Sequence, residues 1–91
     1  MSEDQIQRIT KALADPRRYE ILKRLHKCGQ PLACESVRDC MPITPATLSH
    51  HMKELETAGL IQVIREHKYV SYVLRRDVLD EFLNHLKSDL L

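Results

Sequence analysis

The stretch TPATLSHHMKELETAGL, residues 44–60, decides the fold because it reads as one helix with a marked start and a marked end. Thr44 is a favourable N-cap, and Pro45 suits the first helical position, where its missing N–H removes no hydrogen bond. Gly59 is typical of the residue that ends a helix. Between these signals the apolar residues recur at i, i+4 and i+7, as Leu48, Met52 and Leu55.

The opposite face of this helix is small, polar and mildly basic. It carries Ala46, Thr47, Ser49, His50 and Lys53. A helix that enters the major groove of DNA must fit a channel about 12 Å wide, and small residues near its N-terminus allow that approach. The composition of this face therefore suits DNA recognition.

Two helices are predicted before this segment. Ser2 and Gln5 fit a capping box, and the apolar stripe that follows consists of Ile6, Ile9 and Leu13. Asp15 and Pro16 mark the start of the second helix, which Gly29 ends. Its inner face is predicted to hold Ile21, Leu22, Leu25 and Cys28.

A third helix is predicted to begin at Pro31 and to end before Pro42, because the residue that precedes proline avoids the helical region. Its inner side would hold Ala33, Val37, Cys40 and Met41. The turn that joins it to the helix starting at Thr44 is very short. Two helices joined in this way form a helix-turn-helix.

The periodicity changes after Gly59. Residues 61–74 (IQVIREHKYVSYVL) are rich in β-branched residues and tyrosine, and the charged triplet at 66–68 interrupts them. This pattern predicts a two-stranded hairpin, which after a helix-turn-helix is a wing. Residues 77–90 return to helical spacing. The predicted fold is mainly α with a small β-hairpin, in the order α-α-α-α-β-β-α.

Composition restricts the class of protein further. The 91 residues, with a net charge of +1, suit a single domain without a strong overall field. The sequence shows no signal peptide and no apolar run that would span a bilayer, so no membrane partner is expected. An odd cysteine count of 3 does not indicate a disulfide framework. We expect a cytoplasmic protein with reduced thiols.

The segments ALADPRRYEILKRL, TPATLSHHMKELETAGLI and IREHKYVSYVL resemble the ArsR/SmtB family of bacterial transcription regulators. The resemblance implies one winged helix-turn-helix domain over residues 1–91, with the helix-turn-helix at about 32–58 and the wing at about 61–74. It also implies a homodimeric repressor that binds double-stranded DNA. Because a two-fold dimer binds two half-sites, we predict a pseudo-palindromic operator. The dimerisation helices would be residues 3–14 and 77–90, with Ile6, Ile9, Leu13, Leu79, Phe82, Leu83 and Leu86 at the interface.

The predicted DNA contacts come from the fourth helix and from the wing. They are Thr44, Ala46, Thr47, Ser49, His50, His51, Lys53, Arg65, His67 and Lys68. For His51 the helical spacing equally allows an inward position with a bond to a backbone group. His67 stands where the family usually has a glycine in the wing turn, which predicts a differently shaped wing tip.

Cysteine-based sensing is an alternative reading. Family members that bind soft metals often carry a Cys-x-Cys pair on the third helix, whereas Cys34 and Cys40 have five residues between them. At about 100° per residue they point about 120° apart, too far for one ion. Cys28 and Cys34 are candidate redox thiols across two helices. The family's metal site on the last helix lacks its usual Asp-x-His start, so no metal and no cofactor are predicted.

Two other classes of function were weighed. An enzyme is not expected, because the sequence has neither a glycine-rich phosphate loop nor a nucleophile motif. A winged-helix protein-interaction module is the stronger rival, but such a face would carry exposed aromatic residues or leucines. Residues 44–53 carry none outside the core stripe, which favours DNA. These patterns do not encode the operator sequence or any small-molecule or metal effector. They also do not distinguish an activator from a repressor.

Overall fold

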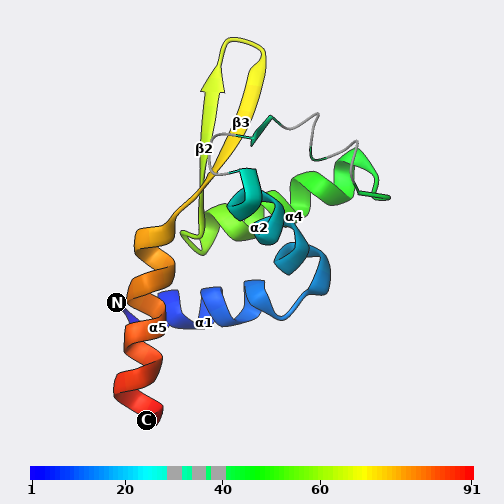
Figure 1. The fold of residues 1–91 in the computed structure, drawn as a ribbon. Helices are drawn as coiled ribbons and strands as arrows, with labels where there is room; N and C mark the ends of the chain where they lie inside the picture. Colours follow the sequence, from blue (N-terminus) through cyan, green and yellow to red (C-terminus); the bar gives the residue numbers. More distant parts are fainter. Residues whose placement is uncertain (29–31, 34–36, 38–40) are drawn as a thin grey trace.

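The computed structural model describes residues 1–28, 32–33, 37 and 41–91, and for Cys28, Leu32 and Ala33 it describes the backbone alone. Figure 1 shows helices packed beneath a narrow sheet, with the hairpin and the last helix pointing in opposite directions. The elements are α1 (Glu3–Leu13), α2 (Pro16–Cys28), β1 (Leu32–Ala33), α4 (Pro45–Thr57), β2 (Ile61–Glu66), β3 (Tyr69–Leu74) and α5 (Arg76–Leu90).

Side-chain caps start the first two helices, as the sequence predicts. The Ser2 hydroxyl accepts a hydrogen bond from the backbone N–H of Gln5 at 3.2 Å. The Asp15 carboxylate accepts from the N–H groups of Arg17 at 2.8 Å and Arg18 at 3.4 Å. These N–H groups have no partner inside their own helix, so the caps satisfy donors that would otherwise be left to water.

Helix α4 has the predicted cap and the predicted end. The Thr44 hydroxyl accepts from the backbone N–H of Thr47 at 3.2 Å, and Pro45 is the first helical residue. At the other end Gly59 has a φ of +83°, which glycine adopts without strain. Its N–H donates to the Glu56 carbonyl at 2.9 Å, and that of Leu60 donates to the Leu55 carbonyl at 3.0 Å. This pair of bonds is a Schellman motif.

The sheet has three strands, and this corrects two predictions. Strands β2 and β3 form the predicted hairpin, but β1 pairs antiparallel with the other edge of β3, with Leu32 opposite Tyr72 and Ala33 opposite Ser71. Leu32 and Ala33 are therefore not the first turn of the predicted third helix, and the helix-turn-helix does not include them. A hairpin alone would leave the second edge of β3 unpaired, and β1 pairs with that edge at Tyr72 and Ser71.

The remainder of the predicted third helix is described only in part. Val37 is helical and fully buried, and Met41 is buried, so both have the inward position that the sequence predicts. Gly29, Cys34 and Cys40, together with the side chain of Cys28, lie outside the described residues.

One core joins all the long helices to the hairpin. Its members are Ile9, Ala12, Ile21, Leu22, Leu25, Val37, Met41, Leu48, Met52, Leu55, Ala58, Leu60, Ile61, Tyr72, Val78 and Phe82. Two of them, Ile9 and Phe82, were predicted to lie at a subunit interface. Because each packs inside its own chain and has almost no exposed surface, that prediction is wrong for these two residues.

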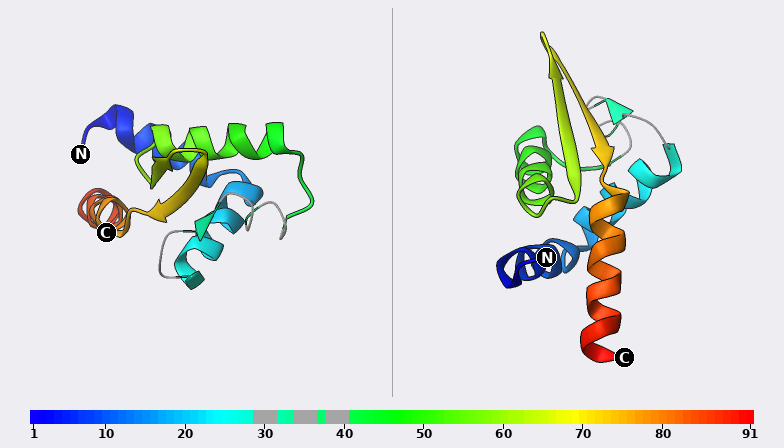
Figure 2. Two further views of the ribbon diagram at one scale, coloured as in Figure 1. Left: turned by 90° about the horizontal axis from the view of Figure 1, so that it is seen from above. Right: turned by 90° about the vertical axis from the view of Figure 1, so that its left-hand side faces the viewer.

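Helix α5 extends away from the other helices along the long axis of the molecule, as the two further views show (Figure 2). The principal extents are 42 × 22 × 22 Å. The amine of Met1 lies 3.4 Å from the Glu81 carboxylate, which holds the start of the chain against α5. No helix among the described residues is long and apolar enough to cross a membrane.

Candidate nucleic-acid interface

The outward face of α4 presents the side chains that the sequence assigns to it. Ala46, Ser49, His50 and Lys53 are exposed, whereas Thr47 is half-buried. The Thr44 hydroxyl donates to that of Thr47 at 2.8 Å. The two threonines therefore form one small polar cluster at the N-terminus of α4, where the positive end of the helix dipole favours an anion.

His51 is the exception, because its side chain points into the molecule. Only 5% of its surface is exposed, so the prediction that it contacts DNA is wrong and the inward alternative is correct. The reason is its place on α4, beside Leu48 and Met52 on the buried stripe. The partner differs from the expected backbone group, since His51 Nδ1 lies 3.3 Å from Nη1 of Arg18.

Arg18 fixes the form of this buried imidazole. Its guanidinium also donates to the carbonyls of Ala12 at 2.9 Å and Lys11 at 3.2 Å. A guanidinium only donates, so His51 Nδ1 accepts and the neutral ring carries its proton on Nε2. Burial lowers the pKa of His51; Asp15 opposes this effect and Arg18 reinforces it. His51 thus joins α4 to the end of α1 and the start of α2.

The wing carries three exposed basic residues, Arg65, His67 and Lys68. His67 has a φ of 56°, the left-handed conformation for which glycine is favoured. Residue 67 thus has a backbone conformation that glycine would adopt without strain, and a wing tip shaped differently from that of the family stays a prediction. The Lys68 ammonium lies 5.7 Å from the centre of the Tyr69 ring, within the range of a cation–π interaction.

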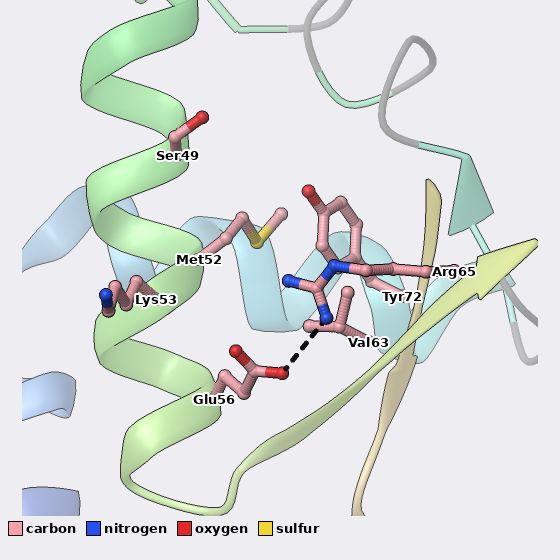
Figure 3. A pocket seen from close by; sticks show the side chains of 7 residues that line it. All are labelled: Ser49, Met52, Lys53, Glu56, Val63, Arg65 and Tyr72. Carbon is pink, nitrogen blue, oxygen red and sulfur yellow. Dashed lines mark ion pairs between the residues drawn. The ribbon is translucent and has the colours of Figure 1, made fainter. Parts of the chain in front are cut away.

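A groove of about 300 Å³ runs between α4 and the hairpin (Figure 3). It is lined by Ser49, Met52, Lys53, Glu56, Val63, Arg65 and Tyr72. Two predicted DNA contacts from different elements, Lys53 and Arg65, therefore line one groove, although the Lys53 ammonium points away from Arg65 (Figure 3). Figure 3 also shows Arg65 reaching toward Glu56, with 3.8 Å between Nη1 and Oε2.

Sequence reasoning did not single out Glu56. Glu56 follows Ser49 by seven residues and Lys53 by three, so all three lie on one face of α4. This spacing could have placed Glu56 beside the predicted DNA contacts. The pairing with Arg65 depends on how the hairpin folds back on α4, which no local pattern encodes.

The described residues contain no cluster of three or more His, Cys, Asp or Glu side chains that would hold a metal ion. On α5 the His85 ring and the Asp89 carboxylate form a pair at 3.2 Å. Arg75 and Asp77 pair at 2.8 Å, and the hydrogen bond from Arg75 lowers the pKa of Asp77. Thiol sensing stays a prediction, because the cysteine side chains lie outside the described part of the chain.

Comparison with known proteins identifies the architecture. A family model described as "Helix-turn-helix domain" matches residues 13–64. The arsenical resistance operon repressor of Staphylococcus aureus is 35% identical over 86 residues, covering 94% of this chain and 81% of the relative. That of Staphylococcus xylosus is 38% identical over 80 residues, covering 88% and 75%.

Solved structures show the same fold. An ArsR-like transcriptional regulator from Rhodococcus superimposes with a TM-score of 0.82 at 20% identity, covering 93% of this chain and 78% of the other. A possible ArsR-family regulator from Mycobacterium bovis, described as a homodimeric winged helix-turn-helix DNA-binding domain, gives a TM-score of 0.75 at 29% identity. That superposition covers 98% of this chain and 88% of the other.

Proposed function

This chain belongs to the ArsR-type family of winged helix-turn-helix transcriptional regulators, and we propose that it is a cytoplasmic repressor that binds a pseudo-palindromic DNA operator as a homodimer. One observation carries the DNA-binding part: the exposed face of α4 is small, polar and basic, whereas its large apolar residues, Leu48, Met52 and Leu55, are turned inward. A surface for a protein partner would carry exposed aromatic or aliphatic anchors.

The exposed residues divide into two roles. His50 and Thr47 lie on the N-terminal half of α4, the part of a recognition helix that contacts base edges, so they would read sequence. Lys53 and Lys68 are long and cationic and would contact phosphates, which fixes the position of the protein without reading bases. Arg65 and His67 would add backbone contacts from the wing.

Two relatives are named as arsenical resistance operon repressors, but the sequence of this chain does not support a response to arsenicals. Cys34 and Cys40 of this chain are separated by five residues in place of a Cys-x-Cys pair. On the described residues, no other set of soft ligands converges.

The test is in vitro selection of bound duplexes from a random DNA library, followed by fluorescence anisotropy with the selected duplex and with a shuffled duplex of the same composition. We expect an enriched site with two inverted half-sites about one helical turn or a multiple apart. The protein should prefer it to the shuffled duplex by ~10³-fold or more.

Variants separate the two roles. Lys53→Ala should weaken binding to both duplexes equally and reduce the slope of log K against log salt by about 0.9 for one lost phosphate contact. His50→Ala should instead change the selected sequence. A library that yields no enriched site would refute DNA recognition, and a single asymmetric half-site would refute the dimeric reader. Identical behaviour of the two variants would refute the division of roles.

A further inference from the structure

The groove between α4 and the hairpin brings one cation and one carboxylate together, and Lys53 also lines it. Lys53 and Glu56 lie on successive turns of α4, and Arg65 reaches over from β2 (Figure 3). The Arg65 guanidinium is paired with the Glu56 carboxylate. In the free protein, therefore, the wing cation that was predicted to contact DNA already has an anionic partner.

This ion pair is readily broken. The closest approach of 3.8 Å is longer than a charge-assisted hydrogen bond, and the side chains are 65% and 40% exposed for Arg65 and Glu56. Water and salt screen such a pair, and exposed pairs contribute little to the stability of a protein. A stronger anion that enters the groove would displace the carboxylate without unfolding any element.

A DNA phosphate is an anion of this kind. It accepts two parallel hydrogen bonds from a guanidinium, and the positive charge of Lys53, which also lines the groove, would attract it from a longer distance. A duplex that rests on α4 and on the wing has its backbone near the junction between them. The groove therefore offers the right charge in the right place, provided that Arg65 leaves Glu56.

We propose that this groove is a phosphate site for the DNA backbone and that Glu56 is its internal competitor. Glu56 holds Arg65 in the free protein and repels the incoming phosphate, so it limits affinity for any duplex that fills the groove. The inference rests on the proposed function, because it assigns an affinity-limiting residue within the same DNA-binding surface.

Glu56→Gln is the variant that tests this proposal, and Glu54→Gln is its matched control. Both remove one negative charge from an exposed or half-exposed position on α4, but Glu54 does not line the groove. At low salt, Glu56→Gln should tighten binding of the selected duplex roughly three- to tenfold, because Arg65 is released and the repulsion is removed. Glu54→Gln should tighten it less than about twofold, through general charge alone.

A double-variant cycle identifies Arg65 as the mediator. Arg65→Gln should weaken binding and reduce the salt slope by about 0.9. In the Arg65→Gln background, Glu56→Gln should lose most of its advantage over Glu54→Gln, because no guanidinium remains to be released and only the repulsion of the phosphate is removed. Circular dichroism of each variant verifies that the fold is intact.

Three results would overturn the proposal. They are equal effects of Glu56→Gln and Glu54→Gln, a full Glu56→Gln effect in the Arg65→Gln background, and unchanged affinity of Arg65→Gln alone. Each of these can occur while the wild-type protein still prefers its selected duplex to the shuffled one. Loss of that preference in the wild type is the separate result that would refute the proposed function.

Discussion

At the scale of single residues, protonation of the His51 ring affects the stability of the folded chain. Burial lowers its pKa in the folded state, whereas in the unfolded chain the ring regains its usual pKa of about 6.5. The unfolded chain therefore takes up the proton more readily, and acid favours unfolding. The neighbouring Arg18 guanidinium adds to this effect, because it would repel a protonated ring.

We expect His51 to make no pH-dependent contribution to stability above about pH 7, and to destabilise the fold progressively as the pH falls through about 6.5 toward its lower folded-state pKa. His51→Gln retains a group that accepts from Arg18 but does not titrate. We would measure the thermal unfolding temperature of this variant between about pH 5 and pH 8. It should fall less on acidification than that of the wild type, because the share of the loss that comes from protonation of His51 is absent.

His50→Gln is the control for this prediction, because His50 is the adjacent histidine and is exposed. It should retain the pH dependence of the wild type. Asp15 acts in a different range: the hydrogen bond from the N–H of Arg17 lowers its pKa, so its contribution is lost only as the pH falls below about 4. Identical pH profiles for wild type and His51→Gln would contradict the assignment.

The Thr44 cap is a second prediction at this scale. Thr44→Ala removes the acceptor for the Thr47 N–H and should lower the free energy of unfolding by about 1 kcal/mol. Thr57→Ala makes the same chemical change at the exposed C-terminal end of α4 and should cost less than about 0.5 kcal/mol. Urea denaturation of both variants measures the difference, and equal losses would show that the cap does not stabilise α4.

At the scale of elements, the helices could be predicted from sequence because their start and end signals are local. Ser2, Asp15, Thr44 and Gly59 each act within a few residues of their own helix. Strand β1 could not be predicted in this way, because its partner strand β3 lies about 40 residues further along the chain. Two residues are also too few to show an alternating pattern.

The candidate site shows the same division between local and long-range information. Helical spacing predicted which side chains of α4 are exposed, except at His51. That residue lies at the edge of the apolar stripe, so the spacing allowed either an outward or an inward side chain, and the structure has it inward. The contact between Glu56 and Arg65 joins α4 to β2 and depends on tertiary packing. Sequence patterns therefore predicted the faces of the elements but not the groove between them.

The wing turn supports a prediction for the hairpin as a whole. His67 has a φ of 56°, which histidine and asparagine tolerate better than β-branched residues do. We expect His67→Val to destabilise the hairpin by about 1–2 kcal/mol, whereas His67→Asn should be nearly neutral. Because both variants lose the imidazole, a DNA contact by His67 would be lost equally in both.

Hydrogen exchange of the β2 and β3 backbone amides would report on the hairpin directly. Faster exchange in His67→Val than in His67→Asn is the expected outcome. The same rate in both would show that the left-handed conformation of residue 67 is not required for the hairpin.

At the scale of the whole molecule, the single chain leaves apolar surface uncovered along α5. The radius of gyration of 13.4 Å exceeds the ~12 Å expected for a compact chain of this length, since α5 extends from the body. Leu83 is 54% exposed, and Leu79 and Leu86 on the same stripe are only partly buried. From α1, Ile6 and Leu13 are also partly buried. These five residues are the part of the predicted dimer interface that remains available to a partner.

Leu83→Lys therefore tests the proposed homodimer. A lysine in an apolar interface must lose its hydration without gaining a partner, so the dimer should dissociate at least ~10-fold more readily in sedimentation equilibrium. Ser88→Lys adds the same charge to the same helix, about 140° round from Leu83, and should leave the dimer intact. Because Leu83 is half-exposed in the single chain, the variant should still fold.

DNA binding extends this argument, since a two-fold dimer binds both half-sites of an inverted repeat at once. Leu83→Lys should bind the selected duplex far more weakly than the wild type does and should bind an isolated half-site as well as the wild type does. If the dimers of Leu83→Lys and Ser88→Lys dissociate equally, the added charge on α5, and not the loss of an apolar contact at Leu83, would be the cause. An unchanged dimer in Leu83→Lys would place the subunit contact elsewhere on the molecule.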